Sequence, residues 1–272
     1  MDSTLAKGLT VLEWLARQRR ECGVSDAARA LGLARSNAHR TLQTLVACGF
    51  AEQNAETSAY RPSLRLFELG TLVGAAVDVA ARVRPQLASL AADTGETIHL
   101  ARLDGAEIVY LDKFDSPLPV AAYSRVGGRA PACCVASGKA LLAAVRPDEA
   151  ALRRLFGELQ AHTPNSITAF DRLHAELVRT AERGYAENRE EWRLGVCGLG
   201  VPVFDARGEA LVAVGMSVPS IRFGRAQAKA FAARLLECAR DASASLGYCL
   251  AGPANHDDKA RSAGRPTRRR IA

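Results

Sequence analysis

The sequence predicts a mixed α+β protein in two parts: a small helical part that ends in a short hairpin, and a larger part built on an antiparallel sheet. Within residues 4–48, apolar side chains recur at helical spacing in three successive stretches. From about residue 96, stretches typical of β-hairpins alternate with helical stretches, as in a sheet covered by helices. The 272 residues are enough for two modest domains, each with its own core.

The first part reads in the order helix, helix, turn, helix, hairpin. A helix over 4–18 is followed by a short helix, for which Ser25 is a plausible N-cap and Gly32 a stop. A third helix over 35–48 ends at Gly49, and two short strands then surround a polar turn and stop at Pro62. This order is that of a winged helix-turn-helix.

One face of the third helix is apolar, with Ala38, Leu42, Leu45 and Val46 at helical spacing, and the other is rich in hydrogen-bond donors. The third helix of such a motif enters the major groove of DNA. No Asp or Glu occurs between Asp26 and Glu52, as expected for a surface that meets phosphates. A solvated face on an ordinary helical bundle is the alternative. The expected contacts to double-stranded DNA are Arg40 and Gln43 at base edges, Arg35, Tyr60 and Arg61 at phosphates, and Ser36, Asn37 and His39 on the same face.

The second part is expected to begin after a helix over 66–80, whose apolar positions alternate at spacings of three and four. Pro85 is expected to open the next helix. The remaining expected elements are a hairpin turning at Asp104–Gly105, a strand in 116–124, a helix from about Ser137, a helix ended by Gly184, a hairpin over 196–218 and a helix over 223–247. The expected domains are 1–63, a linker helix at 64–84, a sheet domain at 85–250, and a basic, disordered tail at 251–272.

Composition narrows the function classes. The hydrophobic share of 48% with 24% charged residues is typical of globular proteins, and no apolar run approaches the roughly 20 residues that span a bilayer. We therefore expect no membrane contact and a cytoplasmic location. The net charge is +7, and residues 253–272 carry six Lys or Arg against two Asp. This segregated positive charge favours a polyanionic partner.

Seven cysteines include no C-x-x-C pair, and none has metal-ligand spacing to a histidine. We expect reduced thiols, no metal site and no cofactor. A redox sensor at the adjacent Cys133–Cys134 is an alternative, although nothing nearby in the sequence is of a kind that lowers a thiol pKa. Catalytic signatures are also missing: "VASGKA" lacks the glycine and hydroxyl of a phosphate loop, and no H-E-x-x-H or G-x-S-x-G occurs. We predict no catalytic residues and no enzyme.

A ligand site is suggested by "APACCVASGKA", residues 130–140, where small side chains precede the start of a helix. Free amides at a helix N-terminus suit a carboxylate. In the strand 209–218, one face carries Leu211, Ala213, Gly215 and Ser217. The side chains on this face become smaller toward the end of the strand, as in the lining of a cavity. Close packing of small residues is the alternative interpretation.

Four stretches together resemble the IclR family of bacterial transcriptional regulators: "KGLTVLEWLA", "VSDAARALGLARSNAHRTLQTLVACGF", "GGRAPACCVASGKALLA" and "RGYAENREEWRLGVCGLGVPVFDARGEALVAVGMSVPSIR". The resemblance covers about residues 5–246. It implies a winged helix, a linker helix and an effector-binding domain related to GAF and profilin folds. It also implies homodimers or homotetramers on palindromic operators near catabolic or transport genes.

Carried over position by position, the resemblance implies an effector pocket lined by Pro119, Ala122, Ala136, Ser137, Asn188, Val196, Gly198, Gly215 and Ser217. The family's binders of small acids tend to have polar side chains where this chain has Gly198 and Gly215. These glycines are expected to enlarge the cavity, which favours an organic acid bulkier than two or three carbons, such as an aromatic acid. A ligand-independent DNA-binding or interaction protein is the alternative.

Overall fold

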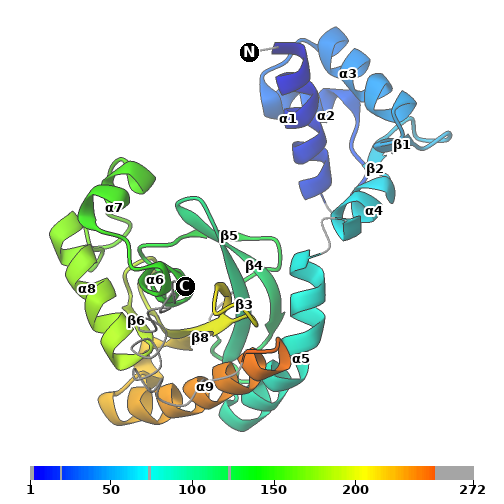
Figure 1. Ribbon diagram of the computed structural model, residues 1–272. Helices are drawn as coiled ribbons and strands as arrows, with labels where there is room; N and C mark the ends of the chain where they lie inside the picture. The colour runs from blue at the N-terminus through cyan, green and yellow to red at the C-terminus, as the bar shows by residue number, and fades with distance from the viewer. Residues whose placement is uncertain (1–2, 19, 73–74, 122–123, 249–272) are drawn as a thin grey trace, which may run out of the picture. The chain divides into compact units, whose positions relative to one another are not determined.

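The computed structural model describes residues 3–18, 20–72, 75–121 and 124–248 (Figure 1). The chain divides into two compact units, residues 1–78 and 79–272, and each is described by itself. The predicted basic tail and the predicted pocket residue Ala122 lie outside the described residues.

The first unit contains helices α1 (Ser3–Arg17), α2 (Val24–Leu31), α3 (Arg35–Ala47) and α4 (Arg65–Leu72) and the hairpin β1 (Ala51–Gln53) and β2 (Tyr60–Pro62). The strands are antiparallel, with Gln53 opposite Tyr60. Its core includes Ala38, Leu42 and Leu45, the predicted apolar face of α3, and Val46 packs against it. The predicted winged helix-turn-helix order is confirmed.

The ends of α2 show what a local pattern can specify. Gly32 ends the helix in the left-handed region at φ 64°, as predicted, because glycine has no Cβ to oppose that backbone conformation. Ser25 is not the N-cap: Gly23 is, and the helix begins at Val24, two residues earlier than a cap at Ser25 would place it. The Asp26 carboxylate accepts a hydrogen bond from the Gly23 N–H at 3.1 Å and stabilises this earlier start.

The second unit is built on a six-stranded antiparallel sheet in the order β5-β4-β3-β8-β7-β6. The strands are β3 (Thr97–Asp104), β4 (Glu107–Phe114), β5 (Arg129–Pro131), β6 (Ala186–Arg189), β7 (Val196–Phe204) and β8 (Ala210–Pro219). Helices α5 (Ala75–Thr94) and α9 (Arg225–Ser245) cover one face, and α6 (Ala136–Val145), α7 (Glu149–Phe156) and α8 (Phe170–Arg183) lie on the other (Figure 1). A short 3₁₀ helix, Ser220–Arg222, precedes α9. Within the described ranges, no helix is both long and apolar enough to cross a membrane.

Three expectations about the helices and the first hairpin are wrong. The helix expected over 66–80 is two helices, α4 and α5, and Pro85 lies inside α5. A proline costs a helix the hydrogen bond of its missing N–H, and here burial of Val83, Leu87 and Leu90 on the core keeps the helix continuous. The first hairpin turns at Gly105–Ala106, one residue later than expected, because Asp104 still pairs with Glu107.

The strand expected in 116–124 is not formed by its described residues, and β5 forms at Arg129–Pro131 instead. Two prolines, Pro117 and Pro119, remove backbone donors from this stretch, so it cannot complete a hydrogen-bonded ladder. The second hairpin, α8 ended by Gly184 and the long last helix are confirmed.

Candidate functional site

The polar face of α3 is the surface that the sequence assigns to DNA. Arg35, Ser36, His39 and Arg40 are exposed and Asn37 is half-buried, while no acidic residue occurs on the helix. The Arg40 guanidinium donates a hydrogen bond to Asn37 Oδ1 at 2.9 Å, which orients it along the helix surface. Ala34 gives α3 no side-chain cap, so the first amides of the helix are open to a phosphate.

Gln43 and Tyr60 do not take the roles expected of them. The expectation that Tyr60 holds a phosphate is wrong, because its side chain is fully buried in the core of the first unit. Its hydroxyl accepts a hydrogen bond from Gln43 Nε2 at 2.8 Å, and the same amide donates to Gln53 Oε1 at 3.0 Å. Both N–H groups of Gln43 are thus used within the protein, where they join α3 to the hairpin.

Arg61 is exposed on β2, as a phosphate contact must be. Its guanidinium pairs with Glu52 across the hairpin, at 2.8 Å between Arg61 Nη2 and Glu52 Oε2, and lies 3.9 Å from Glu21. Two carboxylates therefore compete with DNA for this cation, whereas the Arg40 guanidinium is paired, among the described residues, only with the Asn37 amide.

A cavity of about 170 Å³ lies in the second unit, at the N-terminal end of α6. Six of the nine predicted pocket residues line it: Ala136, Ser137, Asn188, Val196, Gly198 and Ser217. Pro119 is exposed and is not one of the described lining residues. The sequence interpretation missed eight lining residues: His99, Tyr110, Ala121, Val135, Trp192, Arg193, Leu199 and Met216.

Gly215 does not enlarge the cavity, contrary to expectation. A Cβ at this position would lie 2.1 Å from His99 Nε2 and 2.4 Å from Ser137 Oγ, so the glycine makes room for these two side chains. At Gly198, a Cβ would lie 2.7 Å from the Met216 carbonyl oxygen on the paired strand. Both glycines therefore serve close packing.

His99, at the centre of the sheet, forms a buried pair with Ser137. His99 Nε2 lies 2.8 Å from Ser137 Oγ, and the imidazole packs edge-on against Tyr110 at 4.9 Å between ring centroids. Burial lowers the pKa of His99 to about 4, so the ring is neutral near pH 7. The pairing of β3 with β8 places His99 opposite the predicted Gly215, a neighbour that the pattern within β3 alone does not identify.

The polar groups around the cavity are predominantly hydrogen-bond donors. Asn188 Oδ1 already accepts the Glu191 N–H at 2.9 Å, which leaves its NH₂ group for a ligand. The Arg193 guanidinium lies over the Trp192 ring at 4.2 Å, and α6 has no side-chain cap on its first amides. No Asp or Glu is found among the described lining residues. Such a cavity suits an anion, with the Tyr110 and Trp192 rings as apolar walls.

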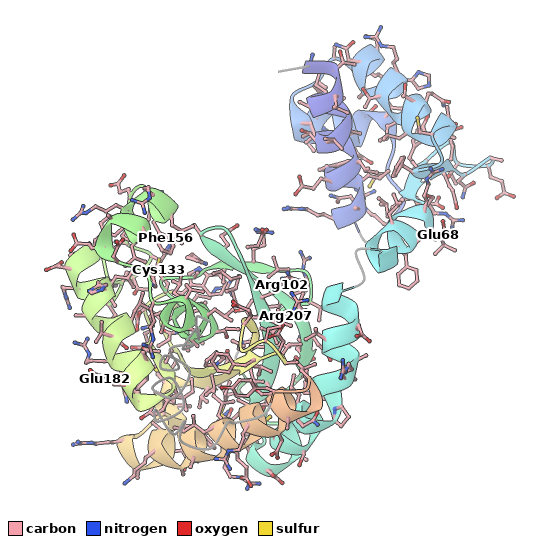
Figure 2. The ribbon with its side chains drawn as sticks, in the orientation of Figure 1. Glu68, Arg102, Cys133, Phe156, Glu182 and Arg207 are labelled. Carbon is pink, nitrogen blue, oxygen red and sulfur yellow. The ribbon has the colours of Figure 1, made fainter. Side chains whose placement is uncertain are left out.

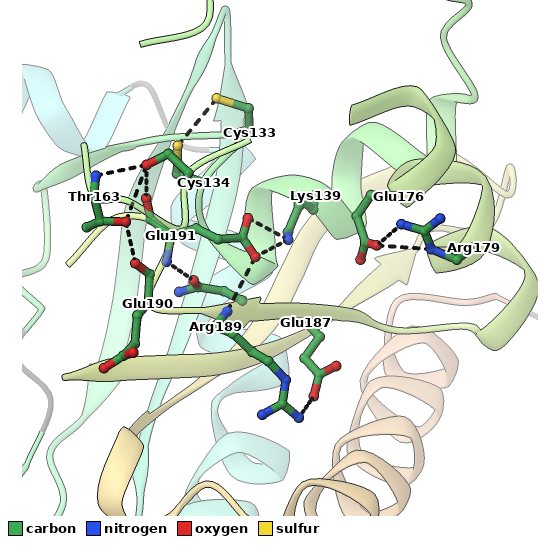
Figure 3. A network of polar contacts seen from close by, with 12 residues as sticks. Cys133, Cys134, Lys139, Thr163, Glu176, Arg179, Glu187, Arg189, Glu190 and Glu191 are labelled. Carbon is green, nitrogen blue, oxygen red and sulfur yellow. Dashed lines mark hydrogen bonds and ion pairs between the residues drawn. The ribbon is translucent and has the colours of Figure 1, made fainter. Parts of the chain in front are cut away.

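A buried ion pair fixes the segment that supplies three of these lining residues (Figure 3). Lys139, 1% exposed, donates to both carboxylate oxygens of Glu191 at 2.7 and 2.8 Å. Burial raises the pKa of Glu191, and the Lys139 ammonium opposes that effect. The neighbouring Glu190 instead accepts the Gly195 N–H, so these two carboxylates do not form an acid–base pair. The ion pair anchors residues 188–193 to α6.

Two family models match the chain: the IclR helix-turn-helix domain over residues 4–55 and the bacterial transcriptional regulator IclR C-terminal domain over residues 72–244. The HTH-type transcriptional regulator KdgR of Escherichia coli is 35% identical over 90% of this chain and 93% of its own length. XynR of the same organism is 33% identical over 90% of this chain and 97% of its own length.

Solved structures share the fold. The Thermotoga maritima IclR structure has a TM-score of 0.73 at 31% identity and covers 91% of this chain and 100% of its own. An IclR homolog from Microbacterium hydrocarbonoxydans, complexed with 4-hydroxybenzoate, has a TM-score of 0.77 at 24% identity over 90% and 99% of the two chains. The matched families and relatives are transcriptional regulators and not enzymes. The chain belongs to the IclR family of bacterial transcriptional regulators, with a helix-turn-helix DNA-binding domain and a C-terminal effector domain.

Proposed function

We propose that this regulator binds a small organic acid in the cavity at α6 and that the acid controls its affinity for an operator. The single observation that carries the proposal is the lining itself: donors from Asn188, Ser137, Ser217 and Arg193 surround a space without any described carboxylate. A carboxylate there would meet hydrogen-bond donors and the positive end of α6, with no like charge to repel it.

The acid is bulkier than glyoxylate or pyruvate and carries an aromatic ring. Trp192 and Tyr110 offer flat apolar walls, which a two- or three-carbon acid would leave uncovered. The volume of about 170 Å³ lies below the roughly 300–1,000 Å³ of pockets for drug-sized ligands, so one ring is the natural upper size. The relative complexed with 4-hydroxybenzoate supports the shared fold and supplies a test compound.

The DNA side of the proposal rests on the exposed face of α3. Arg40 reads a base edge in the major groove, because its guanidinium is exposed and Arg suits guanine. Arg35, Arg61 and the open amides of α3 hold phosphates, and Ser36, Asn37 and His39 complete the surface. Gln43 acts indirectly, by fixing the hairpin to α3.

Two copies would bind a near-palindromic operator as a homodimer, which can pair into a homotetramer. Exposed apolar side chains in the first unit support such pairing: Leu5 is 63% exposed, Leu9 58% and Phe67 71%. The acid would act by favouring one arrangement of the two DNA-binding domains over another. Such a regulator works in the cytoplasm, and its targets are catabolic or transport genes beside its own.

Calorimetric titration tests the effector class. We expect benzoate and 4-hydroxybenzoate to bind the purified protein and glyoxylate and pyruvate to bind far more weakly. Ser217→Ala, in the cavity lining, should weaken benzoate binding, while Ser89→Ala, on the exposed surface of α5, should leave it unchanged. Tight binding of glyoxylate with no binding of benzoate would reject the aromatic acid. Binding of no acid would favour a ligand-independent DNA-binding protein.

Fluorescence anisotropy with DNA from the protein's own promoter region tests the DNA interface. Arg40→Ala should cost about 1–3 kcal/mol on the operator and relax its specificity, because a base contact is lost. Arg61→Ala should weaken operator and random DNA alike, since a phosphate contact carries no sequence information. Equal losses on both DNAs for Arg40→Ala would contradict the assignment of Arg40 to a base edge.

A further inference from the structure

Two adjacent thiols, Cys133 and Cys134, lie in the turn between β5 and α6 and have no place in the proposed function (Figures 2 and 3). Their sulfur atoms are 3.6 Å apart, and the side chains are 5% and 1% exposed. A disulfide joins sulfur atoms at about 2.05 Å, so bonding would draw these two together by roughly 1.5 Å. The pair is therefore placed for a short-range reaction between its own members.

The two thiols are unequal. The hydrogen bond from Cys134 lowers the pKa of Cys133 against the opposing effect of burial, and the same contact raises the pKa of Cys134. Burial raises the pKa of three other thiols, those of Cys22, Cys197 and Cys238. Because the thiolate is the form that attacks peroxides, Cys133 has the character of a nucleophile and Cys134 that of a resolving thiol.

The turn that holds these thiols is pressed against α6. The Cys134 N–H donates to the Pro131 carbonyl at 3.1 Å, which closes the turn. A Cβ on Gly138 would lie 2.3 Å from the Ala132 carbonyl oxygen, so the turn and the helix touch backbone to backbone. The first turn of α6 carries Ala136 and Ser137, both in the cavity lining. We therefore expect a shift of the turn backbone to move the first turn of α6 and, with it, the cavity lining.

We propose that Cys133 and Cys134 form a redox site that hydrogen peroxide converts into a disulfide, and that this change displaces the first turn of α6. The Cys133 thiolate attacks one peroxide oxygen, forms a sulfenic acid and releases water. The Cys134 sulfur then attacks the sulfenic sulfur, forms the S–S bond and releases a second water. In balance, two thiols lose two protons and two electrons, and one peroxide becomes two waters.

Burial decides which oxidants reach the site. Because residues Cys133 and Cys134 are only 5% and 1% exposed, we expect hydrogen peroxide to reach them and a bulky disulfide such as oxidised glutathione not to. The consequence for regulation rests on the proposed function: oxidation would weaken binding of the organic acid, because Ser137 and the α6 amides move away from it.

The full-length Trp14→Phe protein makes the test specific, because Trp192 in the cavity lining is then the only tryptophan of the chain. Hydrogen peroxide should lower the mass by about 2 Da, and peptide mapping should place the new bond between residues 133 and 134. Trp192 emission should shift, and benzoate affinity should fall about tenfold, within the usual range of coupling between sites. Dithiothreitol should reverse all three changes.

Cys133→Ser and Cys134→Ser, made in the same background, should lose the bond and the Trp192 response, whereas Cys48→Ser, at an exposed position, should keep both. Oxidation of Cys133 to a sulfinic acid without a bond to Cys134 would overturn the redox site. A bond without a change in Trp192 emission would overturn the link to α6. If the reduced protein binds no acid, the proposed effector class fails, while the mapped bond and Trp192 still decide the redox proposal.

Discussion

At the scale of single residues, His99 makes the second unit dependent on pH. Its pKa is lowered from 6.5 to about 4 by burial, so between these values the unfolded chain takes up a proton that the folded chain does not. Falling pH therefore stabilises the unfolded state. We expect the free energy of unfolding to drop by about 1.4 kcal/mol per pH unit below 6.5, to a total of about 3 kcal/mol near pH 4.

Urea unfolding at several pH values between 7 and 4, followed by Trp192 emission in the Trp14→Phe protein, measures this loss. His99→Gln in the same background provides the control, because glutamine does not titrate. The pH dependence of the unfolding free energy should be shallower in the variant by the amount that His99 contributes. Parallel curves for the two proteins would mean that His99 is protonated equally in the folded and unfolded states.

At the scale of elements, the sequence predicts the helices and strands whose apolar repeat and end signals lie within the element itself. The third and last helices repeat apolar side chains over several turns, and glycines such as Gly32 and Gly184 mark where the chain turns left-handed. Strands β7 and β8 are nine and ten residues long, and bulky side chains alternate with small ones along β8, which distinguishes it from a helix. Such elements carry their own signals, so no partner is needed to recognise them.

Two short strands of the large sheet, β5 and β6, are not predicted, because no turn signal beside them compensates for their length. The strand β5 is three residues long and exists because Glu107–Val109 of β4 pairs with it, and β6 likewise depends on β7. A run of three or four residues has no period to read. The prediction that Pro85 opens a helix is wrong for a related reason. Proline by itself favours the first turn of a helix, and burial of its neighbours in α5 overrides that preference.

The residues that line the cavity also divide into those that the sequence predicts and those that depend on strand pairing. Resemblance to the family supplied six lining residues, whereas His99 and Tyr110 came together only when β3 and β4 paired. Trp192 and Arg193 lie outside helices and strands, where no periodicity marks a direction for the side chain. Tyr60 was misplaced because its strand is too short to show which face is buried, and its ring fills the core.

At the scale of the whole molecule, positive charge is concentrated near the C-terminal end of the sequence. The net charge is +7, and the six basic residues against two acids in 253–272 account for +4 of it. Helix α9 ends at Ser245, and Tyr248 packs on Phe204 with ring centroids 5.4 Å apart. A chain that stops after Leu250 therefore keeps every contact described for the second unit.

We expect this truncation to weaken binding to random DNA and to reduce its dependence on salt. Each cation that neutralises a phosphate contributes about 0.9 to the slope of log affinity against log salt, so six cations would lower the slope by up to about 5. Anisotropy titrations between 50 and 200 mM salt measure the slope on random and promoter DNA.

A full-length variant with the six basic residues replaced by Gln separates the effect of charge from that of length and should match the truncation. Benzoate binding should stay unchanged in both, because the cavity lining lies before residue 250. An unchanged slope would show that the tail makes no phosphate contacts and that α3 and the hairpin carry the electrostatic attraction alone.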